Sequence, residues 1–231
     1  MMYPEILFML IVLIGFIAFL AYQGFLALYP SIHKGYSWIY GFKMYRVHLP
    51  SNVTDSPYYG KKIGKYTNLE SMYSTIDDPV LKNVAAQLDF ITKRMTPTQK
   101  ANCILKFVQQ NIIYTKDKTQ CDRDECWHFP VNTLVRKKGD CEDSAFLCAG
   151  LMHLCGLDVI NVDMVGHITC AVNVPAIGKK YTVDDVDYYR AETTSAFIQY
   201  VGICLNQDTE IERLIKPTIP SDGFKDLMKD E

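Results

Sequence analysis

Residues 139–156 read GDCEDSAFLCAGLMHLCG, and this stretch organises the rest of the chain. Asp140 is a residue type that caps helix N-termini, and Asp143 places an acid in the first turn. The residues that follow are almost wholly apolar until Gly156, which stands where a helix normally ends. The pattern predicts a buried helix of about four turns, with Cys141 at or next to its first position.

A thiol in this position has a chemical consequence. The N-terminus of a helix carries unpaired N–H groups and the positive end of the helix dipole, and both stabilise a thiolate. We therefore expect Cys141 to have a lowered pKa and to act as a nucleophile. A cysteine that only fills space in the core is the alternative, and position alone does not separate the two.

Length and charge limit the classes of protein to consider. The chain has 231 residues and a formal net charge of -2, which fits one globular domain with an appendage. It has neither internal repeats nor long low-complexity tracts. The weakly acidic balance lacks the basic footprint of nucleic-acid-binding proteins, so we expect no nucleic-acid partner.

The appendage is an apolar N-terminal segment. No charged residue lies between Glu5 and His33, and residues 6–28 are predominantly apolar. At about 1.5 Å per residue this segment spans about 34 Å as a helix, enough to cross a bilayer core. A cleavable signal peptide fits less well, because no basic region precedes the segment and no cleavage site follows. We predict a single-pass transmembrane anchor over residues 1–30, with residues 6–28 in the lipid bilayer.

Two features bear on the side of the membrane that carries the domain, and they disagree. Lys34, Lys43 and Arg46 follow the apolar segment and no basic residue precedes it, which favours the cytoplasmic side. The chain also has eight cysteines, an even number. Cys121 and Cys126 share a polar loop in which a disulfide can form, and this favours an oxidising compartment.

Residues 31–75 are predicted to form a juxtamembrane linker, and residues 205–231 a polar C-terminal tail. The linker has four aromatic side chains close to the predicted membrane exit, Tyr36, Trp38, Tyr40 and Tyr45. Amphipathic aromatics are typical of the lipid headgroup region. A loosely ordered linker, or a strand on the domain surface, explains them equally well.

Between these segments, residues 76–204 have the pattern of an α+β domain. Two helices are predicted first, one capped by Asp78 before a proline and one that begins with a capping box at Thr96. Four short strands follow the central helix, at residues 159–164, 167–174, 181–183 and 188–192. Helices followed by an antiparallel sheet are typical of the α+β class.

A catalytic thiol requires a base, and that base requires a hydrogen-bond acceptor on its second ring nitrogen. Among five histidines, His153 lies about 18 Å along the helix from Cys141, too far to reach the sulfur. His167 begins a strand after the central helix, where packing of the sheet on the helix can bring imidazole and thiol together. Glu192 ends a neighbouring strand and can hold the imidazole.

Six short sequence blocks follow one another along the domain. They are FP at 129–130, TL at 133–134, GDCEDSA at 139–145, LCGLDV at 154–159, VGHITCAV at 165–172 and YYRAETTS at 188–195. In this order and at these separations they resemble the transglutaminase-like superfamily. The resemblance covers about residues 80 to 200. It implies a papain-like core, here preceded by a transmembrane helix, with a Cys-His-acid triad.

Residue by residue, the resemblance implies that Cys141 is the nucleophile, His167 the general base and later general acid, and Glu192 the orienting acid. The family most often has aspartate at the third position, so the glutamate departs from the pattern. Because triads are defined by geometry and not by position, three nearby acids are rivals for this role. They are Asp184, Asp185 and Asp187.

An oxyanion formed during acyl transfer requires hydrogen-bond donors. The backbone N–H of Cys141 is the expected first donor, because it points out of the helix N-terminus. Trp127 and Gln109 are candidates for the second, with packing or a surface position as the alternative for each.

Four groups of residues include types that bind metal ions, but we expect neither a metal nor a cofactor. Cys121, Cys126 and His128 are zinc-binding residue types, but no fourth ligand is evident nearby, so a disulfide or free thiols compete with zinc. Cys148 and Cys155 lie about 10 Å apart along the helix, too far to share a metal, and are expected in the core. Two clusters of acidic residues lack EF-hand spacing and fit solvated turns better than calcium sites. One cluster consists of Asp122, Asp124 and Glu125, and the other of Asp184, Asp185 and Asp187.

We therefore expect a membrane-anchored cysteine enzyme that performs acyl transfer on the amide bonds of a protein or peptide through a thioester. Water as acceptor makes it a peptidase or amidase, and a lysine amine makes it a cross-linking transglutaminase. Hydrolysis is favoured because water is always available. The alternative is a catalytically idle domain of this fold that binds or assembles partners at the membrane, and a small zinc-binding membrane protein is a third possibility.

Overall fold

The computed structural model describes residues 35–61, 72–73, 75–121, 126–194, 199–205 and 209–217. The predicted transmembrane anchor at residues 6–28 lies outside these ranges, as do the calcium alternative at residues 122–125 and the tail beyond residue 217. Within the described ranges, no helix is both long and apolar enough to cross a membrane.

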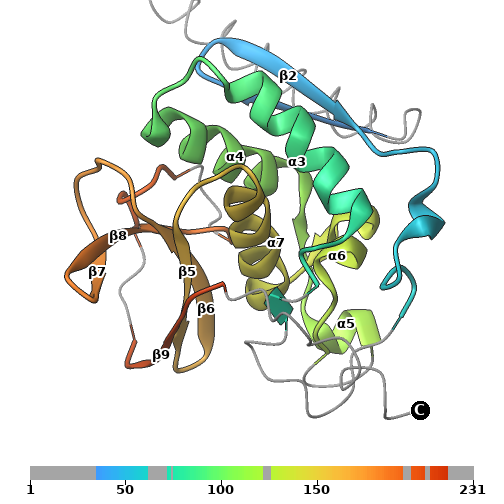
Figure 1. Ribbon diagram of the computed structural model, residues 1–231. Helices are drawn as coiled ribbons and strands as arrows, with labels where there is room; N and C mark the ends of the chain where they lie inside the picture. The colour runs from blue at the N-terminus through green and yellow to red at the C-terminus, as the bar shows by residue number, and fades with distance from the viewer. Residues whose placement is uncertain are drawn as a thin grey trace, which may run out of the picture.

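The described chain places one helix between a helical layer and a sheet (Figure 1). The described helices are η2 (Val53–Asp55), α3 (Pro79–Thr92), α4 (Pro97–Asn111), α5 (Asp117–Cys121), α6 (Pro130–Arg136) and α7 (Cys141–Leu154). The described strands are β1 (Gly35–Tyr40), β2 (Lys43–His48), β3 (Ile113–Tyr114), β4 (Lys138–Gly139), β5 (Val159–Met164), β6 (His167–Val172), β7 (Lys180–Val183), β8 (Val186–Ala191) and β9 (Ile211–Ile215).

Helix α7 is the centre of the domain. Helices α3, α4 and α6 pack on one side of it, and strands β5 and β6 pack on the other. This position explains why the side chains from Glu142 to Met152 are all buried, as expected for a helix that is covered all round. The prediction of a buried helix that begins at Cys141 is confirmed.

The predicted starts of α3 and α4 are also confirmed. The Asp78 carboxylate accepts hydrogen bonds from the N–H groups of Val80 and Leu81. At the start of α4, Thr96 and Gln99 form both hydrogen bonds of a capping box. These caps satisfy N–H groups that a helix start leaves unpaired.

The two ends of α7 differ in how well they were predicted. At the N-terminus Asp140 is the N-cap residue, as expected, but its side chain makes no capping hydrogen bond. Its carboxylate lies instead in a group with Asp117 and Glu142. After the C-terminus, Gly156 has φ +79, the left-handed conformation that favours glycine, as expected.

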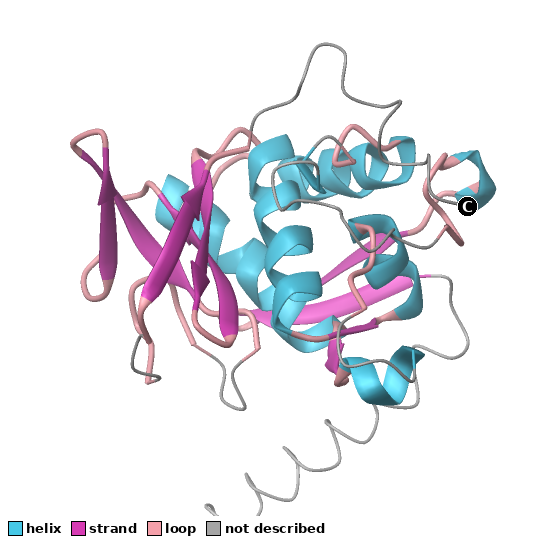
Figure 2. Ribbon diagram, turned by 90° about the horizontal axis from the view of Figure 1, so that it is seen from below, coloured by secondary structure: helices cyan, strands magenta, loops and turns pink. Residues whose placement is uncertain are grey.

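The main sheet has the order β7-β8-β6-β5-β9, with antiparallel pairing throughout (Figure 2). The predicted α+β arrangement of helices and antiparallel sheet is confirmed, and all four predicted strands are present. Strand β6 ends at Val172 and not at Val174. Pro175 follows closely, and a proline cannot donate a hydrogen bond to a neighbouring strand.

Strand β9 lies within the segment that was predicted as a polar tail. Four of its five residues are exposed, so no alternation of apolar and polar residues marks it as a strand. It pairs with β5 at the edge of the sheet. There Arg213 Nη2 contacts Asp163 Oδ2 at 2.7 Å.

The predicted linker contains the β1–β2 hairpin, which belongs to the folded domain. Trp38 is 0% exposed and packs edge-on against Phe107 of α4, with ring centroids 5.1 Å apart. The Tyr36 hydroxyl donates to the Leu134 carbonyl at 2.6 Å. Tyr36 and Trp38 therefore fill the core and do not contact lipid headgroups.

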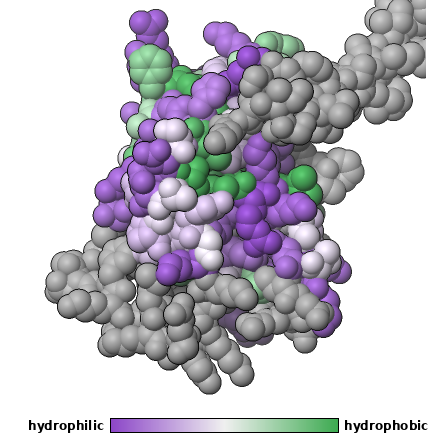
Figure 3. Space-filling view, turned by 90° about the vertical axis from the view of Figure 1, so that its right-hand side faces the viewer, coloured by the Kyte–Doolittle hydropathy of each residue, from purple (hydrophilic) through white to green (hydrophobic). Residues whose placement is uncertain are grey.

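The face to the right in Figure 1 is mainly hydrophilic, with smaller hydrophobic areas (Figure 3).

Candidate active site

Cys141 lies at the junction of α7 and β6. Its Sγ accepts a hydrogen bond from the Ile168 N–H, and its S–H donates to Glu142 Oε2 at 3.1 Å. Burial raises the pKa of the thiol, and the charge of Glu142 raises it further, whereas the Ile168 N–H lowers it. The expected lowered pKa is therefore wrong for this conformation, because desolvation and a neighbouring carboxylate outweigh the helix N-terminus.

His167 and Glu192 form a direct pair. His167 Nε2 lies 3.0 Å from Glu192 Oε2, and the Glu192 side chain is fully buried. Since His167 immediately precedes Ile168, the imidazole and the thiol of Cys141 lie at the same end of β6. In the described part of the chain, no hydrogen bond joins Cys141 to His167.

Glu192 has donors on both oxygens. Arg190 Nη2 contacts Oε2 at 2.6 Å, and Thr194 donates to Oε1 through its N–H and its hydroxyl. Burial opposes ionisation, but the hydrogen bond and charge of His167, the Thr194 N–H and the charge of Arg190 together lower the pKa of Glu192 to about 2. The carboxylate is therefore ionised at neutral pH.

The rival acids have other partners. Asp184 contacts Lys216 at 3.2 Å, and Asp187 contacts Lys180 and Thr182. Asp184 and Asp185 have positive φ in the turn between β7 and β8. Among the described acids, Glu192 is thus the hydrogen-bond partner of the His167 ring.

Gln109 holds the backbone of Glu192. Its Nε2 donates to the Glu192 carbonyl at 2.7 Å, and its Oε1 accepts from the buried Lys106 Nζ at 3.1 Å. Gln109 therefore supports the acid, which differs from the oxyanion role considered for it. Trp127 is half-buried and packs against the core.

Sequence reasoning did not identify Arg190 and Thr194 as partners of Glu192. Both lie in the block that carries the resemblance, but a two-residue separation within a strand does not reveal a shared carboxylate. The available signal was an arginine in the middle of a strand, which needs an anion if it is buried. Arg190 is 1% exposed.

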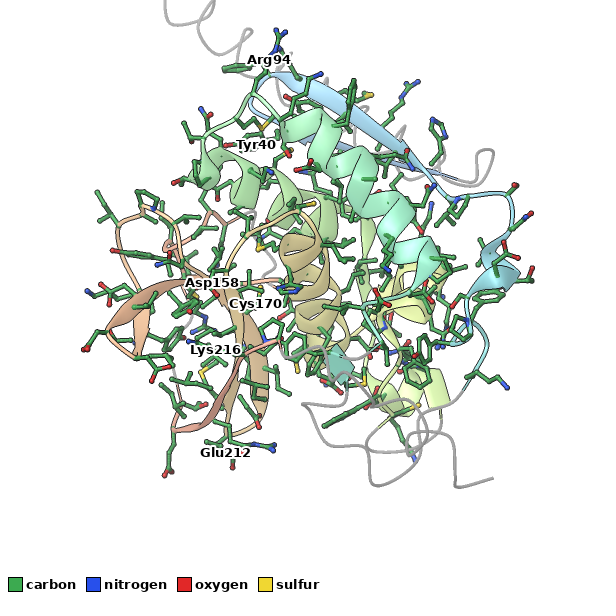
Figure 4. The ribbon with its side chains drawn as sticks, viewed as in Figure 1. Tyr40, Arg94, Asp158, Cys170, Glu212 and Lys216 are labelled. Carbon is green, nitrogen blue, oxygen red and sulfur yellow. The ribbon has the colours of Figure 1, made fainter. Side chains whose placement is uncertain are left out.

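The other thiols of the central layer are structural. Cys148 on α7 and Cys170 on β6 form a hydrogen bond with each other, and both are fully buried. Figure 4 places Cys170 between β6 and α7. Cys155 Sγ donates to the Ala85 carbonyl at 3.4 Å. The prediction that Cys148 and Cys155 are core residues is confirmed.

A second His–carboxylate pair joins the segment before α6 to the first turn of α7. The His128 N–H donates to Asp143 Oδ1 at 2.8 Å, and His128 Nδ1 lies 2.9 Å from Asp143 Oδ2. Arg136 Nη1 contacts Nε2 of the same ring. Because the guanidinium can only donate, Nε2 is the acceptor and Nδ1 carries the proton that goes to Asp143.

In this arrangement Cys126 and His128 are not available as zinc ligands. Cys126 is disulfide-bonded, and both ring nitrogens of His128 have protein partners. The side chain of Cys121, the partner that the sequence suggested, lies outside the described residues. Among the described residues, six cysteines form no disulfide: Cys103, Cys141, Cys148, Cys155, Cys170 and Cys204.

Asp143→Ala is expected to lower the free energy of unfolding by about 2–4 kcal/mol. The change removes two buried hydrogen bonds between Asp143 and His128. Urea unfolding followed by circular dichroism measures the loss. The control is Asp187→Ala, which removes an exposed ion pair and is expected to have a much smaller effect. Equal losses in the two variants would contradict a special role for the buried pair.

Gly139 is required by the packing of the same aspartate. A Cβ at this position would lie 2.5 Å from the Asp143 Cβ, closer than real Cβ atoms approach their neighbours. The GDC sequence thus combines a glycine that makes room for Asp143, an aspartate, and the thiol. Gly139 is fixed by its contact with Asp143, and Cys141 by its place at the start of α7.

One group of side chains has the residue types to hold a metal ion. In the described part of the chain, Asp117, Asp140 and Glu142 each offer a ligand atom, and these atoms lie within 4.8 Å of one another. Carboxylate oxygens bind hard cations such as Mg²⁺ and Ca²⁺. None of the three contacts the His167–Glu192 pair.

Comparison with known proteins adds one positive finding. The model of a family described as transglutaminase-like domain matches residues 80–204, more than half of the chain. The matched range contains Cys141, His167 and Glu192. No curated protein matches the chain.

Proposed function

Because this chain belongs to the transglutaminase-like domain family, we propose that it is a thiol enzyme that transfers acyl groups from amides through a thioester. Cys141 is the nucleophile, His167 the base and Glu192 the acid that orients the imidazole. The observation that carries the proposal is the 3.0 Å contact between His167 Nε2 and Glu192 Oε2, at the end of β6 where the Ile168 N–H binds the thiol.

Glu192 sets the tautomer of the base. Its pKa of about 2 keeps it ionised, so Oε2 accepts the Nε2–H of His167 and leaves Nδ1 to take a proton. The two oxygens of Glu192 serve different partners. Oε2 accepts from His167 and Arg190, and Oε1 accepts from Thr194.

Acylation begins when Cys141 leaves Glu142. Rotation about χ1 turns Sγ away from Oε2, and His167 Nδ1 takes the thiol proton. The sulfur then forms a bond with the amide carbon, and the Cys141 N–H at the helix N-terminus donates to the resulting oxyanion. The C–N bond breaks as His167 returns the proton to the departing amine, which leaves a thioester.

The acceptor in the second half-reaction decides the product. Water gives a carboxylate and a free thiol, with His167 taking the water proton and returning it to sulfur. A lysine amine gives a new amide and a cross-link. We favour water, because it is always available as an acceptor.

We further propose that residues 6–28 anchor the domain in the membrane as a single span, so that its protein or peptide substrates lie close to the bilayer. The first described strand begins at Gly35. The residues between the two can extend at most about 25 Å at about 3.5 Å per residue. A domain on so short a connection stays within reach of the membrane surface.

The products of a glutamine-containing peptide test the reaction. The full chain, purified in mild detergent, is incubated with the peptide and an equal concentration of dansylcadaverine, and the products are analysed by mass spectrometry. We expect amide hydrolysis, by deamidation or peptide cleavage, to exceed amine incorporation. Predominant incorporation would contradict hydrolysis and favour cross-linking, and absence of both products would contradict acyl transfer from this substrate class.

A catalytically idle domain that binds partners at the membrane is the second candidate. The observation that favours it is the hydrogen bond from Cys141 to Glu142, together with a thiol pKa that burial raises. An enzyme needs the thiol released from this contact, whereas a binding domain does not. Turnover by the wild-type chain therefore excludes the idle-domain alternative.

A further inference from the structure

Three buried carboxylates converge beside the nucleophile. Asp117 opens α5, and Asp140 and Glu142 flank Cys141 at the start of α7. Their exposed fractions are 4%, 8% and 6%, so each is more than nine-tenths buried. One ligand atom from each lies within 4.8 Å of the others.

Each of these carboxylates has an oxygen without a partner. Asp117 Oδ1, Asp140 Oδ1 and Glu142 Oε1 are buried and receive no hydrogen bond. The side chains of Asp140 and Glu142 share a hydrogen bond with each other, and two further oxygens accept hydrogen bonds from neighbouring groups. Asp117 Oδ2 accepts from the Cys126 N–H at 2.5 Å, and Glu142 Oε2 accepts from the Cys141 thiol at 3.1 Å.

Other buried carboxylates in the described part of the chain are paired differently. Glu192 has Arg190, His167 and Thr194, and Asp143 has His128 on both oxygens. Among the described ion pairs, none brings a Lys, Arg or His to Asp117, Asp140 or Glu142.

Buried carboxylates without donors are costly, and two arrangements relieve the cost. The carboxylates can take up protons, or a cation can lie between them. Ligand atoms from all three carboxylates lie within 4.8 Å of one another, and each side chain has a buried oxygen without a partner. Such close carboxylates are expected where a bound cation supplies positive charge.

We propose that Asp117, Asp140 and Glu142 bind one hard divalent cation of the Mg²⁺ and Ca²⁺ class, with water in the remaining coordination positions. An all-carboxylate donor set selects hard cations over zinc or copper, which prefer nitrogen and sulfur ligands. The ion ties the start of α5 to the start of α7. It lies beside the nucleophile, because the second oxygen of Glu142 contacts Cys141 Sγ.

The structure supplies an optical probe for this ion. Burial, and then the charges of neighbouring groups that include all three carboxylates, raise the pKa of Tyr114, so its ring lies close to the proposed site. Tyrosine excitation can therefore sensitise Tb³⁺ luminescence. The full chain, treated with a chelator, is titrated with Tb³⁺, and CaCl₂ and MgCl₂ are then added as competitors.

We expect saturable binding of one Tb³⁺ per chain that Ca²⁺ or Mg²⁺ displaces. Asp117→Asn is expected to weaken the affinity at least about tenfold, because ligand charge sets the affinity of such sites. The control is Asp187→Asn, an exposed acid on another face, which should bind as the wild type does. Should Asp117→Asn fail to fold, Glu142→Gln provides the same comparison.

A thermal unfolding measurement on the wild-type chain gives a second readout. We expect CaCl₂ or MgCl₂ at millimolar concentration to raise the unfolding midpoint relative to chelator, since an ion that binds the folded state stabilises it. The cation site is overturned if neither salt shifts the midpoint, or if the Asp117→Asn chain binds Tb³⁺ as tightly as the control. Either result leaves protonated carboxylates as the explanation. No substrate is involved, so these outcomes are independent of acyl transfer.

Discussion

Cys141→Ala is expected to reduce amide turnover at least about a thousandfold. Without Sγ no thioester can form, and water alone must attack the amide. The fully buried thiols of Cys148 and Cys170 cannot take its place. The measurement is the rate of product formation from the glutamine peptide, followed by mass spectrometry with the full chain.

The matched control is Cys204→Ala. Cys204 is also a half-buried cysteine that forms no disulfide, but it lies far from the start of α7 in the sequence. We expect this variant to keep wild-type turnover. Circular dichroism must show that both variants are folded. Full turnover by a folded Cys141→Ala chain would remove the thiol from the mechanism.

Arg190→Met is expected to lower the free energy of unfolding by about 3–5 kcal/mol at neutral pH. The side chains of Arg190 and Glu192 are 1% and 0% exposed, so the change leaves a buried carboxylate without its guanidinium. Methionine fills a similar volume, and most of the loss therefore comes from the charge. Urea unfolding measures the difference. Arg190→Lys keeps the charge but loses the planar geometry, and we expect a smaller loss.

The pH dependence of this difference tests its cause. The pKa of Glu192 is about 2 in the folded chain and about 4.3 in an unfolded one. A lowered pKa contributes stability that is fully present above the unfolded value and is lost as the pH falls through the folded value. The gap between wild type and Arg190→Met should therefore narrow between about pH 4 and about pH 2. A gap that stays constant over this range would indicate lost packing and not lost charge.

Helix starts were predictable because the signals for them are local. Asp78 and Thr96 cap helices through N–H groups two or three residues away, and Cys141 opens α7 directly after the GD pair. Strands β5 to β8 were likewise expected from the sequence. The pair of His167 with Glu192 followed from the resemblance to a known family, and their contact is present in the structure.

Long-range contacts explain where the structure differs from the predictions made from the sequence. The β1–β2 hairpin was indistinguishable from a linker, because the burial of Trp38 depends on residues far along the chain, such as Phe107. Strand β9 has mostly exposed residues and no alternation. The Asp140 carboxylate did not cap α7, because burial with Asp117 and Glu142 gives it a different environment.

The sequence by itself determined the α+β order of elements, the central helix and the position of the thiol at its N-terminus. These depend on neighbours within a few residues and on periodic burial. Only the tertiary structure decided the charge state of that thiol, the donors on Glu192 and the meeting of three carboxylates beside Cys141. Those properties depend on desolvation and on groups distant in the chain, such as Gln109, which is 83 residues from Glu192, and no local pattern encodes either.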